Sequence, residues 1–447
     1  MSKNTLISHS GRLLTERNLD YRLETPSRDG FVVAWPPQRH WRPVEKTSQV
    51  TPRPLHLYFH IPFCLQRCRY CFFKVGILSE NSHEVREAYV DALCKEVEMV
   101  ADAMELRGRH VCSIYFGGGT PRVLSPEQLA RVKKTIDAHF VLDDPEFVFE
   151  IEPVTFSNRL IDSLPDLGVN RISFGVQSFD DRVVALTGRH DTEEKNCRAI
   201  ERALGTGAVV NIDLLSGLEG ETEVSWRHSV NRATGLGVHA ITMYKLELYS
   251  NAEYMEGLKH GKLSLPNNQQ ELEFARYGIE QFQSNGYLPS TYFTFTREGK
   301  FPQRHIISRW RGEDMYGFGA SAFGSINNES RQNVSEIDDY LKCIKEGEIP
   351  LHRSLKNSSL DNMMRDVIMG LKTTTIDLSN YYKRHGIRLE SLLSTAIESL
   401  VSTGLLYRDG EKLHLTQEGI IYGDYCGRYL GAALRNIMTG EQRPLRA

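Results

Sequence analysis

The sequence has no long apolar run. None of its hydrophobic stretches approaches the length of about eighteen residues that a membrane-spanning helix requires. Residues 1–5, Met-Ser-Lys-Asn-Thr, are polar and lack the apolar segment of a signal peptide. We therefore expect a cytoplasmic protein with no membrane partner.

The sequence also lacks a strong excess of either charge. Its 447 residues include 54 Lys and Arg and 57 Asp and Glu, so the formal net charge is −3. Such a balance argues against a nucleic acid as the main partner. The length suits one large and one smaller domain with a sizeable core.

A fourth cysteine is missing from the most informative segment of the chain. Cys64, Cys68 and Cys71 have the spacing C-x3-C-x2-C, and no further cysteine follows within twenty residues. Three thiolates in one loop can bind three irons of a [4Fe–4S] cube, whose complete protein ligand set is four cysteines. One iron would then be open to a ligand that is not protein. The other five cysteines stand singly, as reduced thiols do in a cytosolic protein.

The same three cysteines have two other interpretations. They could be buried small hydrophobic residues, or they could bind zinc with His60 as the fourth ligand. Zinc usually takes its ligands as two separated pairs, and His60 lies in an expected strand before a Pro-Phe turn. The spacing therefore favours the cluster.

Short runs rich in β-branched and aromatic residues alternate with helical patterns. Six such runs occur at residues 55–61, 113–116, 147–152, 171–176, 209–215 and 240–248. Between them, segments such as 85–106 and 126–140 show the 3.6-residue apolar period of amphipathic helices. Strands that alternate with helices predict an α/β fold with a parallel sheet, curled or open.

Polar and glycine-rich features follow five of these runs, at the edge where β/α barrels carry their working residues. The cysteine loop follows the first run, and residues 117–121, Gly-Gly-Gly-Thr-Pro, follow the second. Glu150 and Glu152 end the third run, Gln177 the fourth and Asp213 the fifth. Five signals at one edge indicate a ligand site there.

Each of these features also has a plainer interpretation. The three glycines let the backbone approach a ligand with ammonium and carboxylate ends, or they simply form a tight turn. Glu150 and Glu152 share one face of a strand, so they either line the interior, where a ribose diol or a cation would partner them, or lie on the surface. Asp213 stands in an otherwise apolar strand, where an uncompensated charge would be costly.

The two ends of the chain differ from its centre. Residues 1–53 are rich in proline and arginine, and we expect an arm that packs on the barrel, with Trp35 and Trp41 as anchors. Residues 356–447 contain helical patterns before a hairpin with Asp409-Gly410 at its turn. This order predicts a winged-helix-like domain. Because it has no basic stripe, we expect it to cover the substrate or pack on the barrel rather than bind DNA.

The chain resembles the radical S-adenosylmethionine (SAM) superfamily. Within it, the chain is similar to the branch of oxygen-independent coproporphyrinogen III oxidases, haem chaperones, and class C radical SAM methyltransferases and cyclopropanases. The resemblance rests on Leu57-Tyr-Phe-His-Ile-Pro-Phe-Cys64, on the glycine loop and on the strand-end motifs, and it runs from about residue 55 to 430. It implies a partial (β/α)6 barrel over residues 54–355 and a winged-helix-like domain over 356–447.

The resemblance also implies cofactors and site residues. Cys64, Cys68 and Cys71 would hold a [4Fe–4S] cluster, whose open iron is chelated by the amino and carboxylate groups of SAM. Tyr70 would contact the adenine, and the loop ending at Thr120 would hold the methionine end. The residues implied to contact SAM are Tyr58, Tyr70, Gly118, Gly119, Thr120, Glu150, Gln177, Arg189, Asp213 and Glu247.

Within the branch, the sequence departs from two subgroups. Coproporphyrinogen oxidases place a further cysteine two residues after the third, where this chain has Phe73. Haem chaperones typically carry Gly-Leu-Pro-Gly-Gln-Thr, where this chain has Gly217-Leu-Glu-Gly-Glu-Thr222. The segments Cys71-Phe-Phe-Lys-Val75 and Met243-Tyr-Lys-Leu-Glu-Leu248 are more similar to the methyltransferases and cyclopropanases.

The leading hypothesis is therefore a radical SAM methyltransferase or cyclopropanase. The resemblance implies that an electron from flavodoxin or ferredoxin leads to cleavage of one SAM to a 5′-deoxyadenosyl radical. A second SAM would donate a methylene group to an sp2 carbon of a small-molecule substrate. Tyr58, Tyr244 and Glu247 are the candidate catalytic residues, with Glu247 or Tyr244 moving the final proton. Tetrapyrrole chemistry, either coproporphyrinogen oxidation or haem degradation, and a haem chaperone are the alternatives.

Overall fold

The computed structural model describes residues 28, 30–42, 53–78, 82–153 and 157–440, and the backbone of two short paired strands, β1 (Leu6–Ile7) and β2 (Leu13–Leu14). Most of the expected N-terminal arm therefore lies outside the described residues. In the described part, no helix is long and apolar enough to cross a membrane.

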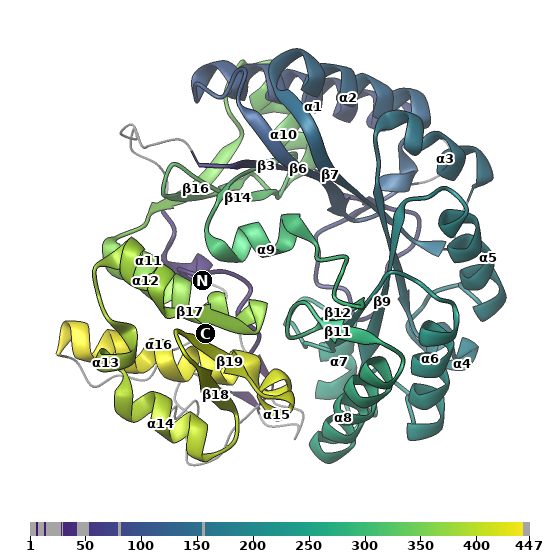
Figure 1. Ribbon diagram of the computed structural model, residues 1–447. Helices are drawn as coiled ribbons and strands as arrows, with labels where there is room; N and C mark the ends of the chain where they lie inside the picture. Colours follow the sequence, from purple (N-terminus) through teal and green to yellow (C-terminus); the bar gives the residue numbers. More distant parts are fainter. Residues whose placement is uncertain are drawn as a thin grey trace.

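A parallel sheet forms the centre of the molecule (Figure 1). Its six central strands lie side by side in chain order, and each pairs with the next in parallel register. They are β3 (Leu55–Ile61), β6 (His110–Gly118), β7 (Val141–Ile151), β8 (Arg171–Gln177), β9 (Val209–Ser216) and β10 (Ala240–Lys245). All six coincide with predicted runs, so the α/β class and the partial barrel are confirmed.

The sheet extends beyond these six strands at both edges, which the sequence analysis did not predict. Next to β3 lies β13 (Asp314–Phe318), which is parallel to it and is followed by an antiparallel meander. The meander consists of β14 (Phe323–Ile326), β15 (Glu329–Asn333) and β16 (Leu351–Lys356). At the other edge, β12 (Thr294–Arg297) and β11 (Tyr287–Pro289) continue antiparallel from β10. Within the described residues this sheet has twelve strands.

Amphipathic helices cover the outer face of the parallel strands (Figure 1). They are α1 (His83–Ala103), α2 (Pro126–His139), α3 (Asn158–Ser163), α4 (Asp181–Leu186), α5 (Glu193–Leu204), α6 (Glu223–Gly235), α8 (Asn268–Ser284) and α10 (Ile337–Lys345). α7 (Glu253–Lys259) lies beside the cysteine loop instead, where the Tyr254 N–H donates to the Arg69 carbonyl at 3.0 Å. The start of α2 is set by a capping box, in which the Ser125 hydroxyl accepts from the Gln128 N–H at 3.2 Å. α1 and α2 fall on the two predicted helical segments.

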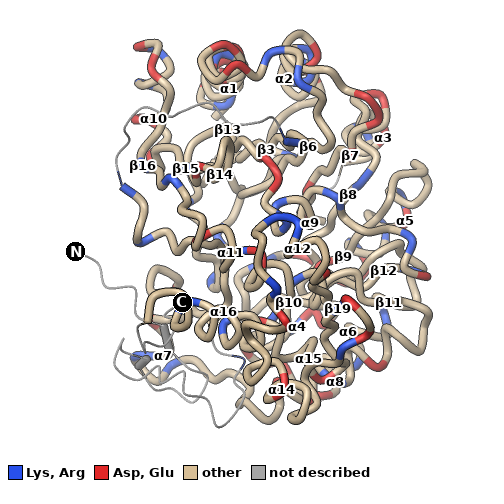
Figure 2. Tube along the Cα trace, turned by 60° about the vertical axis from the view of Figure 1, so that its left-hand side comes forward, with Lys and Arg blue, Asp and Glu red and all other residues tan. Residues whose placement is uncertain are grey.

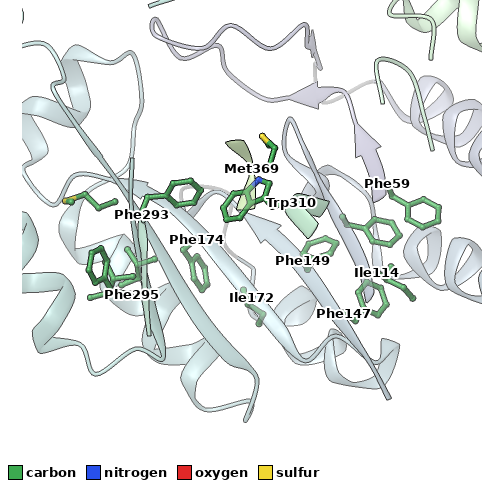
Figure 3. Close-up of a cluster of buried hydrophobic side chains, with 14 of the residues drawn as sticks. Phe59, Ile114, Phe147, Phe149, Ile172, Phe174, Phe293, Phe295, Trp310 and Met369 are labelled. Atoms are coloured by element: carbon green, nitrogen blue, oxygen red, sulfur yellow. The ribbon is translucent and has the colours of Figure 1, made fainter. Parts of the chain in front are cut away.

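The core lies between the sheet and these helices (Figure 3). Phe59 on β3 stacks between Phe116 on β6 and Phe318 on β13, with ring centroids 4.7 and 4.9 Å apart. The alternating residues Ile172, Phe174 and Val176 of β8 are all fully buried in this core. This packing holds the strand ends, and therefore the loops that follow them, in fixed positions.

The C-terminal segment forms a helical unit with a small antiparallel sheet. Its elements are α11 (Ser359–Ile368), β17 (Thr375–Asp377), α12 (Leu378–His385), α13 (Leu389–Leu392), α14 (Ser394–Ser402), β18 (Leu406–Asp409), β19 (Lys412–Leu415), α15 (Gln417–Ile421) and α16 (Gly423–Thr439). The hairpin of β18 and β19 turns at Gly410, which has φ +55°. The predicted order of helices followed by a hairpin is thus present. Acidic and basic residues are interspersed along the described trace (Figure 2).

The described part of the N-terminal segment packs between the barrel and the C-terminal unit. Trp41 is 5% exposed, and its ring lies 5.9 Å from that of Phe323. The Val32 N–H donates to Asp424 on α16 at 3.3 Å, and the Val33 carbonyl accepts from Arg309 at 3.2 Å. Residues 30–42 thus contact both the barrel and the C-terminal unit, and the expectation of an arm over residues 1–53 stays a prediction.

A buried polar junction joins the barrel to the C-terminal unit. Lys372 is 1% exposed; its ammonium group lies 2.7 Å from Asp424 and 2.5 Å from the Tyr292 hydroxyl. That hydroxyl in turn donates to Asp424 at 2.8 Å. The Lys372 ammonium also lies 4.2 Å from the centre of the Phe31 ring, a cation–π distance. The buried ammonium group is tolerated because a carboxylate, a hydroxyl and an aromatic ring compensate its charge.

Removing the Tyr292 hydroxyl is expected to weaken this junction. Tyr292→Phe keeps the ring but removes one hydrogen bond from Lys372 and one from Asp424, so the free energy of unfolding should fall by about 2 kcal/mol. Urea unfolding followed by circular dichroism measures the change. Tyr277→Phe is the matched control, because its hydroxyl makes an exposed 3.0 Å bond to Asn231. Equal stability of the two variants would contradict the prediction.

Candidate SAM and iron–sulfur site

The three cysteines lie in the loop after β3, at the carboxyl edge of the parallel strands. Cys64 ends β4 (Phe63–Cys64), which pairs with β5 (Gly76–Ile77). A tight turn places the Cys71 N–H 3.0 Å from the Cys68 carbonyl oxygen. Cys64 and Cys68 are buried, and Cys71 is half-buried. All three thiols therefore share one short folded loop.

The surroundings of these thiols disfavour the charged thiolate form. Burial raises the pKa of Cys64 to about 12 and that of Cys68 to about 11, and it raises the pKa of Cys71 as well. Three thiolates would repel one another in this loop unless positive charge sat between them. Iron supplies that charge and deprotonates its thiol ligands. The donor set of three cysteines thus fits a [4Fe–4S] cluster with one iron left for another ligand.

The zinc interpretation fits this loop less well. Within the described residues, no three His, Cys, Asp or Glu side chains converge closely enough to hold a single metal ion. His60, the expected fourth zinc ligand, is committed elsewhere, because its Nδ1 lies 2.9 Å from the Tyr58 hydroxyl.

The glycine loop packs directly against the cysteine loop. A Cβ atom on Gly119 would lie 2.5 Å from the Phe63 carbonyl oxygen, and one on Gly118 would lie 2.6 Å from the His60 ring. Gly118 has φ +111°, a conformation that side chains rarely allow. The Gly119 N–H donates to the Ile61 carbonyl at 2.8 Å. Only glycine permits this approach, whatever ligand the loop meets.

Glu150 lies inside the barrel rather than on its surface. Its carboxylate accepts hydrogen bonds from the Tyr115 hydroxyl and from the Gly118 N–H, the latter at 3.2 Å. Burial raises the pKa of Glu150 to about 7, and the negative charge of Asp213 adds to the shift. The negative charge of the neighbouring Glu152 raises the pKa of the cysteine thiols, which places Glu152 beside their loop.

Asp213 on β9 is the second interior carboxylate. It accepts from Ser173 at 3.1 Å and from Asn211 at 2.8 Å. Burial raises its pKa to about 6 despite these donors. Two carboxylates that are easily neutralised therefore face one space, and a cationic ligand such as SAM would hold both in the charged form.

Gln177 ends β8, and the guanidinium group of Arg189, from the segment after α4, reaches the same strand. Gln177 has φ +69° at a bulge in β8, a strained conformation for a residue with a side chain. Arg189 is 3% exposed, pairs with Asp191 at 2.7 Å and donates to the Gly175 carbonyl at 2.7 Å. Its other Nη atom lies 3.5 Å from the Tyr70 hydroxyl. The structure thus brings Gln177, Arg189 and Tyr70 to the edge that carries the cysteine loop.

Tyr244 and Glu247 lie farther along the same edge. The Tyr244 ring is 5.0 Å from that of Phe293. Burial is the main cause that raises the pKa of the Tyr244 hydroxyl, and the charges of Asp213 and Glu150 raise it further. Burial is also the main cause that raises the pKa of Tyr249, and the charge of Glu247 raises it further. Glu247 therefore lies within electrostatic reach of Tyr249.

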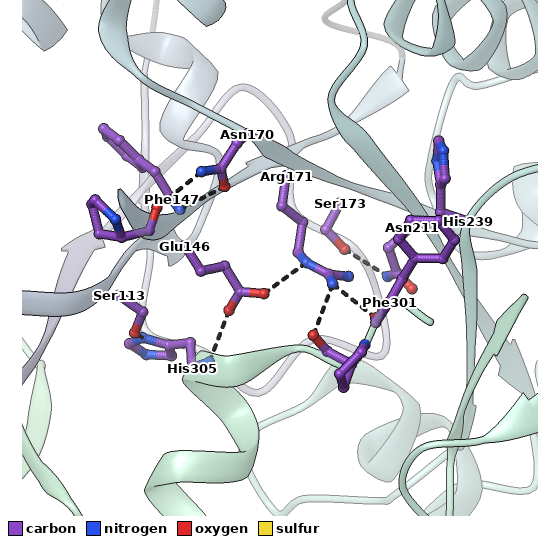
Figure 4. Close-up of polar contacts among 12 residues, drawn as sticks. Ser113, Glu146, Phe147, Asn170, Arg171, Ser173, Asn211, His239, Phe301 and His305 are labelled. Carbon is purple, nitrogen blue, oxygen red and sulfur yellow. Dashed lines mark hydrogen bonds and ion pairs between the residues drawn. The ribbon is translucent and has the colours of Figure 1, made fainter. Parts of the chain in front are cut away.

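Sequence reasoning missed a polar layer inside the barrel (Figure 4). Glu146 and Arg171 form a buried ion pair at 3.0 Å, and Ser113 bonds the ring of His305 at 2.7 Å. His305 comes from α9 (Arg304–Arg311), which the sequence analysis did not place inside the barrel. The signal that could have found this layer is the period of two along the strands, since Ser173 stands four residues before Gln177 on β8.

The affinity for SAM is expected to depend on pH through Glu150. SAM is a cation at its sulfonium and ammonium groups, so it favours the carboxylate form of a residue with a pKa of about 7. Affinity should therefore rise roughly three- to tenfold from about pH 6 to about pH 8. Equilibrium dialysis of labelled SAM against the reconstituted protein measures this rise. Glu150→Gln should bind more weakly, with a smaller pH dependence; an identical slope in both proteins would contradict the assignment.

Comparison with known proteins agrees with this fold and site. A model of the radical SAM superfamily matches residues 58–233, and a model of the HemN C-terminal domain matches residues 357–422. A parallel barrel with a three-cysteine loop at its carboxyl edge, together with these matches, defines a radical SAM protein, a class that uses a [4Fe–4S] cluster and SAM.

The similar proteins place the chain more narrowly. The heme chaperone HemW of Bacillus subtilis is 30% identical over 381 residues, which are 84% of this chain and 98% of that protein. An oxygen-independent coproporphyrinogen III oxidase of Pseudomonas aeruginosa is 28% identical over 393 residues, 84% and 85% of the two chains. The solved structure of coproporphyrinogen III oxidase (HemN) from Escherichia coli matches with a TM-score of 0.77 and 25% identity, covering 90% of this chain and 96% of that one. The chain belongs to the HemN/HemW-like branch of the radical SAM superfamily.

These findings correct the leading hypothesis of the sequence analysis. The predicted methyltransferase or cyclopropanase activity is wrong, because the similar proteins are heme chaperones and coproporphyrinogen oxidases. The prediction failed because the residues that form the cysteine loop and face the SAM site are shared across the branch. The choice of the subgroup therefore rested on two short segments alone, residues 71–75 and 243–248.

Proposed function

We propose that this protein binds SAM and a [4Fe–4S] cluster at the barrel edge and handles a tetrapyrrole of the haem class there. The observation that carries the proposal is the convergence of three thiols, a glycine loop and two interior carboxylates at one edge. The names and coverage of the relatives support the ligand class, because this chain spans 98% of a heme chaperone. Phe73, in the place of a cysteine of the oxidases, favours haem over a porphyrinogen substrate.

In this proposal each strand end has one task. Cys64, Cys68 and Cys71 hold the cluster, which supplies the electron for reductive cleavage of SAM when it is bound. Gly118 and Gly119 present backbone groups to the methionine end of SAM. The remaining contacts to SAM are proposed for Tyr58, Tyr70, Thr120, Glu150, Gln177, Arg189, Asp213 and Glu247.

Other parts of the earlier expectation stay predictions. Flavodoxin or ferredoxin is the proposed electron donor, and the cytoplasm the predicted location. A second SAM molecule stays a prediction without support from the comparisons. The proton transfer assigned to Glu247 or Tyr244 belonged to the methylene-transfer scheme and is not carried into this proposal.

Anaerobic reconstitution tests the proposed function. The holoprotein is expected to bind haem in an absorption titration and to release 5′-deoxyadenosine from SAM when dithionite is added. Absence of both haem binding and SAM cleavage would refute the proposal.

A second candidate function is oxidation of coproporphyrinogen III. Its support is the match to the solved oxidase over 96% of that structure, including the C-terminal unit. Incubation of the reduced holoprotein with SAM and coproporphyrinogen III distinguishes the two candidates. Formation of protoporphyrinogen with release of carbon dioxide would establish the oxidase, whereas haem retention without decarboxylation would favour the first proposal.

A further inference from the structure

Three aromatic side chains form a stacked column beside the cysteine loop. The ring of Phe72 lies 4.4 Å from that of Phe73, with planes 26° apart, and 3.9 Å from that of Tyr249, with planes 28° apart. Phe72 is common to both pairs, so it is the middle ring and Phe73 and Tyr249 are the ends. The Asn251 side chain donates to the Phe72 carbonyl at 2.7 Å, which fixes the middle of the column.

One end of this column is open. Phe73 is 42% exposed, so its ring is accessible from outside the column. Phe72 directly follows Cys71, so the column continues the loop that carries the thiols. The ring of Phe73 lies 6.4 Å from that of His60, against which Gly118 packs. The exposed ring therefore stands next to the glycine loop at the barrel edge.

The other end of the column faces the C-terminal unit. Besides burial, the charges of Glu247 and of Asp424 on α16 raise the pKa of Tyr249. The Tyr249 hydroxyl therefore lies within electrostatic reach of both carboxylates. The column thus runs from the cysteine loop toward the junction of Lys372 and Asp424.

We propose that the column of Phe73, Phe72 and Tyr249 is the stacking surface for a planar, fully conjugated tetrapyrrole. The proposal rests on the proposed function for the ligand class and adds the place of binding and a shape requirement. Near-parallel rings with an open end extend by one more flat π layer in offset-stacked geometry. Haem and porphyrins are flat and conjugated, whereas a porphyrinogen has sp3 carbons between its pyrroles and is folded. The column therefore selects the flat form.

Three substitutions at Phe73 separate stacking from simple hydrophobic contact. Phe73→Trp keeps a π face, Phe73→Leu keeps apolar bulk without one, and Phe73→Ala removes both. Tyr407→Ala is the matched control, because Tyr407 is 48% exposed and stacks on His414 at 4.9 Å in the C-terminal hairpin. All variants are made in the full chain, reconstituted anaerobically, and checked for unchanged iron content and circular dichroism.

The probes are haem, metal-free protoporphyrin IX and coproporphyrinogen III, each titrated into the holoprotein. Phe73→Ala is expected to weaken haem and protoporphyrin IX by roughly tenfold and Phe73→Leu by several-fold, while Phe73→Trp and Tyr407→Ala bind as the wild type does. Coproporphyrinogen III should bind at least tenfold more weakly than protoporphyrin IX to the wild type and should be insensitive to Phe73.

The outcomes separate this inference from the proposed function. If the wild type binds haem but Phe73→Ala binds it equally well, the column is not the binding surface and the proposed function stands. If Phe73→Ala weakens haem and leaves protoporphyrin IX unchanged, the contact acts through iron, and the stacking proposal is overturned. If the wild type binds no tetrapyrrole, the proposed function fails and this inference fails with it.

Discussion

The Cys68→Ala variant is expected to lose the iron–sulfur cluster and with it the cleavage of SAM. Cys68 is buried between Cys64 and Cys71, and its backbone carbonyl anchors the turn that positions Cys71. A cube that already has one iron without a protein ligand would then have two. Substitution of residues that only orient metal ligands already lowers metal affinity or activity about 10- to 100-fold. Loss of a ligand itself should therefore reduce 5′-deoxyadenosine formation by more than about 100-fold.

Iron content and 5′-deoxyadenosine formation measure this effect in parallel. Cys343→Ala is the control, because Cys343 is half-buried on α10 and stands apart from the other cysteines in the chain. It should retain the iron, the visible absorption and the SAM cleavage of the wild type. A Cys68→Ala protein with a full complement of iron and undiminished SAM cleavage would show that the cluster is held elsewhere.

The central sheet and the positions of its strand ends could be predicted because their signals are local. Each parallel strand is rich in β-branched and aromatic residues, several of them at alternating positions, and polar or glycine-rich residues stand at or near its carboxyl end. Cys64, Gly118, Glu150, Gln177 and Asp213 could then be placed at one edge, since consecutive parallel strands end at the same side of a sheet. The structure brings the first four to that edge, whereas Asp213 lies inside the barrel, three residues before the end of β9.

The interior of the barrel could not be predicted in the same way. Whether His305 lies inside depends on how α9 crosses the sheet, and nothing near residue 305 encodes that crossing. The bond between Ser113 and His305 joins residues 192 positions apart in the chain. The strands added at the edges were missed for a related reason, because they pair with strands far away in the chain: β13 pairs with β3 across more than two hundred and fifty residues.

The choice among functions failed for a chemical reason. Tyr58, Glu150 and Asp213 face the place proposed for SAM, and a site for SAM is common to chaperones, oxidases and methyltransferases. Such residues identify the cofactor and carry no information about the second ligand. The residues that could carry it, Phe73 and Tyr249, stand in loops after strands, where short motifs have no period that would indicate their neighbours.

Replacing Gly118 by alanine is expected to prevent SAM binding almost completely. The new Cβ would lie 2.6 Å from the His60 ring, and φ +111° is already unfavourable for alanine. The His60 ring cannot easily move away, because its Nδ1 is bonded to Tyr58 at 2.9 Å and the His60 carbonyl accepts from Tyr89 at 2.9 Å. The loop must therefore shift by an ångström or so. A displacement of that size is expected to weaken SAM binding about 100-fold, because the bound geometry is lost.

A second glycine separates the steric clash from the strain in the backbone. Gly108 has φ +75°, and a Cβ there would meet no atom within 4 Å. Gly108→Ala should therefore lose only the roughly 1 kcal/mol of an alanine at positive φ and bind SAM normally. Equilibrium dialysis with labelled SAM and thermal unfolding, performed on both variants, give the comparison. If Gly118→Ala bound SAM as Gly108→Ala does, the close packing of Gly118 on His60 would have no part in forming the SAM site.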